Sequence, residues 1–375
     1  MNNSKIIIKG STSLLPFLLF ILLGILLNIY SAHACTISDT IITRQESTAE
    51  NNRPNLFNSD SLLEITIVTD IRKLIRDVGK KRQYHPATLT YQTKDSSVTL
   101  DVNLKTRGDF RKDRSICSFP PLRIKFQKKQ VSNTLFNHQE KLKMVTHCQN
   151  RSKRHQQMLI QEYLIYKAYN LFTPESFRVR LARITYMNND LSKKIIKYAF
   201  FLEDPDQMAQ RNNKIIVRRN KLHQDATAMD KITRLAVFQY LIGNTDWGVP
   251  TLHNIKLIAI KPSARPVAVP YDFDWSALVD APYAVPQEIL HISSIHERLY
   301  RGYERSLKDL EFIFREFRQK KIDLYSLYVN CPYLEDYQKE SVLNYFDQFY
   351  ETINDPKKVK REFIEKSRKY KYKKH

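Results

Sequence analysis

Glycine is scarce in this chain, which has seven glycines in 375 residues. This scarcity argues against enzyme classes that cradle phosphates in glycine-rich loops. The sequence also lacks the Gly-x-Ser-x-Gly segment of serine hydrolases and the His-Glu-x-x-His segment of zinc proteases. It has no Cys-x-x-Cys pair, so we expect no structural zinc site.

Only one long apolar run occurs, from Leu14 to Tyr30, and this excludes a membrane protein with many spans. Lys5 and Lys9 precede the run, and an Ala-x-Ala sequence ending at Ala34 follows it. This order predicts a signal peptide that is cleaved after Ala34. The alternatives are an uncleaved anchor and a lipoprotein attached through Cys35. In each case the globular part is exported to the periplasm, the cell surface or the medium.

The four cysteines of the chain are Cys35, Cys117, Cys148 and Cys331. All four remain after cleavage, and an oxidising compartment permits disulfides between them. Four cysteines allow three pairings, and the spacing alone does not select one. Cys117 and Cys148 flank a region that resembles a sheet, which favours that pair.

The chain is strongly basic, with a formal net charge of +22. Such a field attracts anions, including phosphates, acidic polymers and anionic lipids. Residues 356–375 carry ten Lys or Arg against two Glu. This tail is expected to be either a solvated, frayed helix or a contact surface for a polyanion or membrane. No sequence-specific nucleic-acid partner is predicted.

The pattern of apolar residues predicts an α+β protein. Strand-like alternation fills the first half, interrupted by one long helix at 154–172, and helical spacing dominates after 225. Residues 36–57 are polar and predict a flexible leader. The strands are expected at 62–68, 87–92, 97–106, 122–127, 142–146, 177–186, 197–202, 255–260 and 267–269.

Two segments of the second half concentrate acidic and amide side chains. The first, 243–254, reads Gly-Asn-Thr-Asp-Trp-Gly-Val-Pro-Thr-Leu-His-Asn, and the second, 270–275, reads Pro-Tyr-Asp-Phe-Asp-Trp. An apolar helix precedes the first segment, and two short strands, consistent with a β-hairpin, separate the two. The order is therefore helix, loop with Asp then Asn, hairpin, and loop with Asp.

This order suits phosphoryl transfer, a reaction that depends mainly on positioning and electrostatics. Asp246 is the candidate carboxylate that orients or deprotonates the attacking hydroxyl. Asn254 and Asp272 are the candidate magnesium ligands, since Mg²⁺ prefers hard oxygen atoms. Asp274, two residues further on, is expected to project to the same side and share the cation.

The segment 240–275 resembles the kinase-like spore-coat protein H (CotH) family and, more remotely, HipA-type kinases. The similarity extends upstream over 102–126 and 142–201. The resemblance implies a bilobal protein-kinase-like fold that binds ATP between a strand-rich N-lobe with one long helix and a helical C-lobe. The expected segments are a signal peptide (1–34), a flexible leader (35–57), an N-lobe (58–204), a C-lobe (205–355) and a basic tail (356–375).

The resemblance also implies three cofactor-binding residues. Lys143 would hold the α- and β-phosphates of ATP, Glu162 on the long helix would position it, and Glu203 would lie near the hinge. Three other basic residues compete for the role of Lys143: Arg123, Lys125 and Lys141.

The implied function is that of an exported atypical kinase. It would use ATP and Mg²⁺ or Mn²⁺ to phosphorylate a hydroxyl group of a protein Ser/Thr or of another alcohol. One alternative is a catalytically inactive relative that binds a nucleotide or a polyanion at the surface. Another is a metal-dependent glycosyltransferase that uses the Asp272-Phe273-Asp274 segment.

Overall fold

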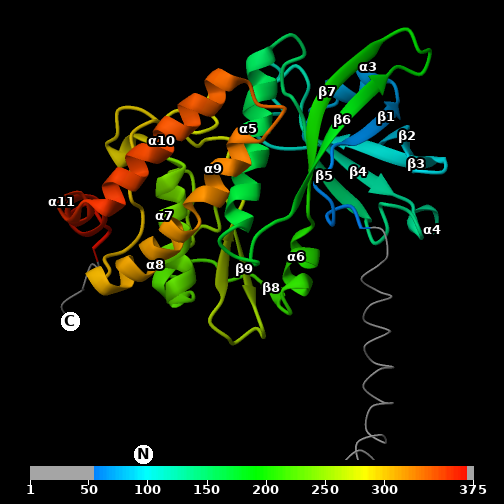
Figure 1. Cartoon of the computed structure of the whole chain (residues 1–375). Helices are drawn as coiled ribbons and strands as arrows, with labels where there is room; N and C mark the ends of the chain where they lie inside the picture. The colour runs from blue at the N-terminus through cyan, green and yellow to red at the C-terminus, as the bar shows by residue number, and fades with distance from the viewer. Residues whose placement is uncertain (1–54, 370–375) are drawn as a thin grey trace, which may run out of the picture. The chain divides into compact units, whose positions relative to one another are not determined.

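The computed structural model describes residues 55–369, and every structural statement below refers to that part of the chain (Figure 1). The expected signal peptide, most of the expected leader and the last six residues of the basic tail lie outside it. Within 55–369, no helix combines the length and the apolar character needed to span a membrane.

Seven strands of the first half form a closed barrel in the order β1-β2-β3-β4-β5-β7-β6. Neighbouring strands are antiparallel, except that β1 pairs with β6 in parallel and so closes the ring. The strands are β1 (Leu63–Val68), β2 (His85–Gln92), β3 (Ser97–Thr106), β4 (Leu122–Phe126), β5 (Lys141–Val145), β6 (Val179–Met187) and β7 (Lys194–Leu202).

Alternation of apolar and polar residues decides which side chains fill the barrel. On β4, for example, Leu122, Ile124 and Phe126 are buried, whereas Arg123 and Lys125 between them point to the outer face. This is the two-residue period of a strand with one buried face. Two short helices lie beside the barrel strands: α3 (Ile71–Arg76) and α4 (Lys128–Val131).

The predicted bilobal protein-kinase-like fold is wrong, although the α+β class agrees with the structure. The strand-rich half is a closed barrel instead of the expected N-lobe sheet. Closure depends on the parallel pairing of β1 with β6, in which Leu63 lies opposite Ala182. Such pairing joins residues far apart in sequence, and periodicity in one strand does not indicate which strand it will meet.

The predicted long helix is α5 (Lys153–Asn170), which begins at the N-cap Ser152, whose side chain accepts a hydrogen bond from the backbone of His155. It packs against β6 and β7 and lies between the barrel and the helices that follow residue 228 (Figure 1). Most of its residues are buried, and Tyr166 contacts Phe273 from the second half. The helix therefore joins the barrel to the segment that contains the predicted site.

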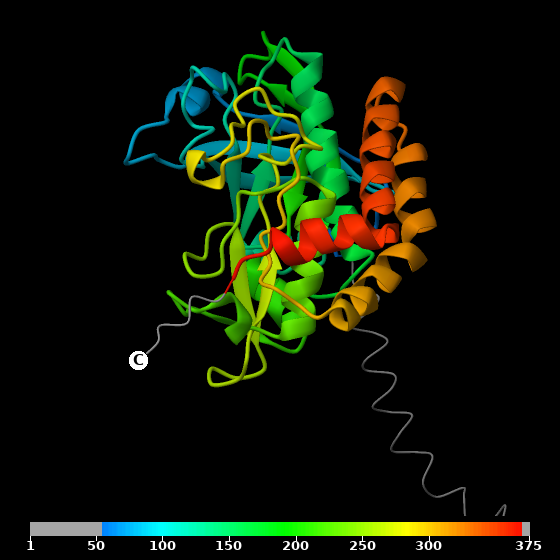
Figure 2. The same ribbon diagram turned by 90° about the vertical axis from the view of Figure 1, so that its left-hand side faces the viewer.

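The second half contains helices and one small antiparallel sheet in the order β10-β9-β8. The predicted hairpin is confirmed as β9 and β10, and helices α9 and α10 lie side by side (Figure 2). The elements are α6 (Pro205–Arg211), β8 (Ile215–Val217), α7 (Met229–Leu241), β9 (Ile255–Ala259), β10 (Val267–Pro270), α8 (Leu307–Gln319), α9 (Lys321–Val329), α10 (Asp336–Asn354) and α11 (Pro356–Val359).

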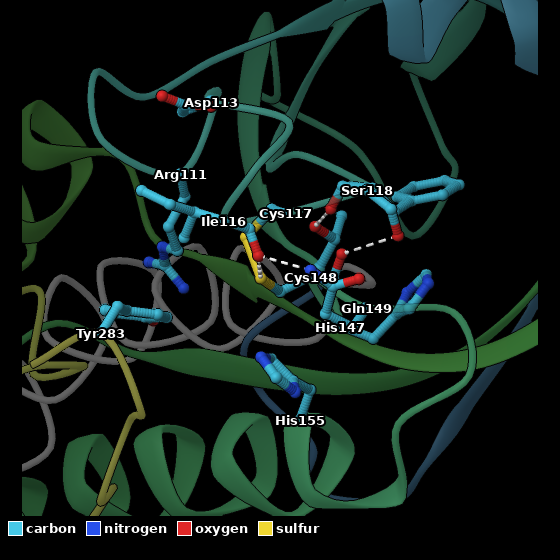
Figure 3. Close-up of a disulfide and its surroundings, with 12 residues drawn as sticks. Arg111, Asp113, Ile116, Cys117, Ser118, His147, Cys148, Gln149, His155 and Tyr283 are labelled. Carbon is cyan, nitrogen blue, oxygen red and sulfur yellow. Dashed lines mark hydrogen bonds between the residues drawn. A yellow bond between two sulfur atoms is a disulfide. The ribbon is translucent and has the colours of Figure 1, made fainter.

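The favoured disulfide between Cys117 and Cys148 is confirmed. It connects the loop between β3 and β4 to the segment between β5 and α5 (Figure 3). Cys331 is buried with a free thiol, and Cys35 lies outside the described residues. The bridge thus ties down the long loop that leads toward the candidate site.

Candidate functional site

A cavity of about 840 Å³ lies between barrel strands β3 to β5 and the two loops of the second half that contain the predicted acidic residues. Its barrel side is basic, and its other side is rich in acidic and amide groups. The basic side chains are Arg82, Lys105, Arg107, Arg111, Arg123 and Lys143. The facing polar side chains are Asp246, His253, Asn254, Asp272, Asp274 and Gln287.

Asp246 lies on the loop that begins at Gly243, directly after helix α7. Gly243 has φ +63°, and a Cβ atom there would lie 2.6 Å from the Cβ of Ala277, so the tight exit from the helix requires glycine. Asp246 Oδ1 lies 2.7 Å from His253 Nε2, and Asp246 Oδ2 accepts a 2.9 Å hydrogen bond from Asn254 Nδ2. These contacts hold the carboxylate in one orientation at the cavity wall.

The hairpin β9–β10 brings Asn254 and Asp272 together. Ile255 pairs with Pro270 at its end, and the backbone N–H of Tyr271 donates a 3.0 Å hydrogen bond to the carbonyl oxygen of Asn254. Asn254, just before β9, and Asp272, just after β10, therefore lie at the same end of the hairpin. Both adopt left-handed backbone conformations, with φ 50° and 63°.

Asp272 remains open to the cavity, because 37% of its side chain is exposed. Asn254 donates both of its side-chain hydrogen bonds to Asp246 through Nδ2, which leaves Oδ1 as the atom for a ligand. Carboxylate and amide oxygens are what Mg²⁺ takes from proteins, and it commonly fills its other positions with water and substrate phosphates. These two residues fit the predicted metal.

Within residues 55–369, no group of three or more His, Cys, Asp and Glu side chains is arranged to hold a metal ion. Asp274 in particular differs from Asp272, since only 8% of its side chain is exposed. Its Oδ2 accepts a 3.0 Å hydrogen bond from Tyr283 and lies 3.3 Å from Arg111 Nε. Burial raises the pKa of Asp274, and Arg111 opposes that rise.

The basic side of the cavity comes from neighbouring strands. Lys105 on β3 lies opposite Arg123 on β4, and Arg123 lies opposite Lys143 on β5, so the three cations form one row across the outer face of the barrel. Lys143 Nζ lies 5.6 Å from the centre of the Tyr271 ring. Arg107 follows β3 directly and also lines the cavity. A row of cations beside Asp272 is suited to a polyphosphate.

Glu162 does not pair with Lys143 as the resemblance implies. Its carboxylate is almost fully buried, and Oε2 lies 3.4 Å from Arg111 Nη1. Burial raises the pKa of Glu162, and the charge of Arg111 lowers it. The guanidinium of Arg111 also contacts Asp272 Oδ1 at 3.3 Å. Arg111 is therefore the ionic partner that the sequence analysis missed, and no motif around it indicates this role.

Glu203 lies at the end of β7, away from the lining of the cavity. Its carboxylate binds Arg211, with Nε to Oε1 at 2.9 Å, and accepts a 2.8 Å hydrogen bond from the backbone N–H of Arg178. These bonds attach α6 to the start of β6. The side chain of Glu203 is thus committed to structural contacts.

Lys143 carries an unusual pKa that leads to a testable pH dependence. Burial, together with Arg107, Lys256 and Arg123, lowers its pKa to about 8. Lys143 is therefore cationic below pH 8 and becomes neutral above it. We expect affinity for ATP, measured by titration calorimetry, to fall above pH 8, by at most about tenfold per pH unit. Lys143→Arg should remove this pH dependence. If the affinity of the variant fell above pH 8 as it does in the wild type, the role of Lys143 would be contradicted.

Comparison with models of known protein families finds none that matches this chain, and no curated protein matches it either. The resemblance to the CotH family stays a prediction from the quoted residues.

Proposed function

We propose that this protein is an exported phosphotransferase that uses ATP and a divalent cation, Mg²⁺ or Mn²⁺, to phosphorylate a hydroxyl group of a protein Ser/Thr or another alcohol. The proposal includes membership of the CotH family. It does not include the two-lobed fold, because the structure has a closed barrel instead. The observation that carries it is a cavity in which a row of cations faces Asp246, Asn254 and Asp272. Phosphoryl transfer needs these two kinds of wall together, one for phosphates and one for metal and nucleophile.

Each wall has a distinct role in the proposed reaction. Lys143, Arg107 and Arg123 bind the phosphate oxygens, whose charge they offset. Asn254 and Asp272 would hold the metal ion, which would supply positive charge to offset the negative charge that develops on the transferred phosphate.

Asp246 acts on the acceptor. Its carboxylate accepts a hydrogen bond from the attacking hydroxyl and orients the oxygen toward the γ-phosphorus. As the new O–P bond forms and the bond to ADP breaks, the hydroxyl proton passes to Asp246 and then to solvent. His253 and Asn254 hold the carboxylate for this step, since they contact its two oxygens.

A second candidate function is nucleotide or polyanion binding without transfer. The observation that favours it is the ion pair between Arg111 and Asp272, because a guanidinium on a metal ligand competes with the metal. In this case ATP binds, and no phosphate moves.

The test compares Asp272→Ala with a matched control at the same cavity, Asp109→Ala. Asp109 also lines the cavity, but 99% of its side chain is exposed. We expect MgATP to raise the melting temperature of the wild type and of Asp109→Ala, and to leave that of Asp272→Ala unchanged. Circular dichroism checks that each variant is folded.

Three outcomes distinguish the kinase, the binding protein and the glycosyltransferase. Stabilisation with γ-phosphate transfer to a degenerate Ser/Thr peptide pool supports the kinase. Stabilisation without transfer or autophosphorylation supports the binding protein. No response to MgATP, with a response to a nucleotide sugar and Mn²⁺, contradicts both and favours the glycosyltransferase.

Export is proposed on separate grounds. The first 34 residues have the order of a signal peptide. The disulfide between Cys117 and Cys148 supports this proposal, since disulfides persist mainly in oxidising compartments. Contact of the basic tail with a polyanion or a membrane surface remains a proposal from its composition.

A further inference from the structure

Arg111 occupies the centre of a group of three carboxylates. Its Nη1 lies 3.4 Å from Glu162 Oε2, its Nη2 lies 3.3 Å from Asp272 Oδ1, and its Nε lies 3.3 Å from Asp274 Oδ2. Only 11% of the Arg111 side chain is exposed. The three acidic residues come from α5 and from the segment after β10, so folding brings them to this one guanidinium.

A guanidinium is well suited to this position. It is planar, stays charged and offers several donors in a fixed geometry, so each of its three nitrogens can face a different carboxylate. Without it, Glu162 and Asp274 would be two buried carboxylates close to a third, which is costly unless a cation compensates them. The Arg111 charge therefore offsets the negative charge of this group even when no ligand is bound.

The loop between β3 and β4 holds Arg111 in place. Phe110 packs against Trp275 and Tyr283, with ring centres 5.5 Å and 5.4 Å apart. At the far end of the loop, Cys117 is bonded to Cys148, and Figure 3 shows Arg111 directed toward Tyr283 from the loop that leads to this bridge. The side chain is thus anchored on both sides, unlike a mobile surface arginine.

This arrangement limits the number of metal ions the cavity can hold. Two-metal phosphotransfer sites use carboxylates that each contact a cation. Here Arg111 already occupies the buried side of the group of three carboxylates. The exposed part of the Asp272 carboxylate stays available to a ligand. One divalent ion therefore has protein ligands available, at Asp272 and Asn254, and a second would have to displace the guanidinium.

We propose that Arg111 is a positioning residue that serves as the permanent second cation of this site, so that the cavity binds a nucleoside triphosphate with one divalent ion. This inference rests on the proposed function and specifies its metal requirement. Arg111 holds Asp272 and Asp274 in place, and it supplies the positive charge that a second metal ion would otherwise bring.

The test counts metal ions directly. Mn²⁺ bound per chain is measured by electron paramagnetic resonance in the full chain saturated with the non-hydrolysable analogue AMP-PNP. The wild type is expected to bind one Mn²⁺. Arg111→Gln is expected to bind two, because the vacated carboxylates can then take the second ion. Arg111→Lys, which keeps the charge, is expected to bind one.

The matched control is Arg114→Gln, which removes an exposed arginine from the same loop and should leave the count at one. Two Mn²⁺ ions in the wild type, or one in a folded Arg111→Gln, would overturn the inference and leave the proposed function standing. If the wild type fails to bind AMP-PNP, the proposed function fails as well. If Arg111→Gln does not fold, the wild-type count decides by itself.

Discussion

Replacing Asp246 with asparagine is expected to lower kcat for γ-phosphate transfer by about a thousandfold, the usual range for the loss of a general base. Affinity for MgATP should stay within about twofold of the wild type, because Asp246 acts on the acceptor and the nucleotide is held by other residues. The measurement is single-turnover transfer to a degenerate Ser/Thr peptide pool, together with the dissociation constant for MgATP.

The structure indicates the side effect to control for. Asp246 Oδ2 accepts a hydrogen bond from Asn254 Nδ2. In Asp246→Asn, the side-chain NH₂ group can face Asn254 Nδ2, and two donors cannot form a hydrogen bond. The loss of that bond costs about 1 kcal/mol of stability. His253→Ala removes one of the remaining contacts to Asp246 and keeps the carboxylate and its contact with Gln287, so it should lower the rate far less than Asp246→Asn does. Transfer by Asp246→Asn within tenfold of the wild type would rule out the assigned role.

The second large effect is expected from the disulfide. The double substitution Cys117→Ser and Cys148→Ser opens a bridge that spans 31 residues of sequence. Such a cross-link limits the unfolded chain, and its loss is expected to lower the free energy of unfolding by roughly 3 kcal/mol. Urea denaturation of the full chain, read by circular dichroism, measures the difference.

Affinity for MgATP should fall in the same variant, because the bridge anchors the loop that carries Arg107 and Arg111 into the cavity. The control is Cys331→Ser, which changes a buried free thiol far along the chain and leaves the bridge intact. A reducing agent should weaken the wild type to the level of the double variant and leave the double variant unchanged. Equal stability of the wild type and the double variant would refute the anchoring role.

Much of the local structure could be predicted from the sequence. The two-residue alternation of segments such as Leu122–Phe126 indicates a strand with one buried face, and the structure confirms it as β4. The long helix is confirmed as α5 because its apolar spacing and its end near Pro174 are local signals. The hairpin between the two acidic loops is confirmed for the same reason.

The candidate site was partly predictable. Asp246, Asn254 and Asp272 lie close together along the chain, and the one hairpin between them brings the ends into contact, so their order predicts one cavity. The resemblance pairs Glu162 with Lys143, and only the fold shows that Glu162 binds Arg111. The loop that carries Arg111 has no periodic pattern, so nothing in its sequence indicates where the side chain goes.

The sequence by itself determined the seven barrel strands as separate strands, the long helix α5, the α+β class and the pair of acidic loops joined by a hairpin, because each depends on residues a few positions apart. Only the tertiary structure decided that the first seven strands close into a barrel, and that Arg111 reaches Glu162, Asp272 and Asp274. Both depend on contacts between segments more than 50 residues apart, whose choice of partner is set by packing the whole core and pairing every buried charge.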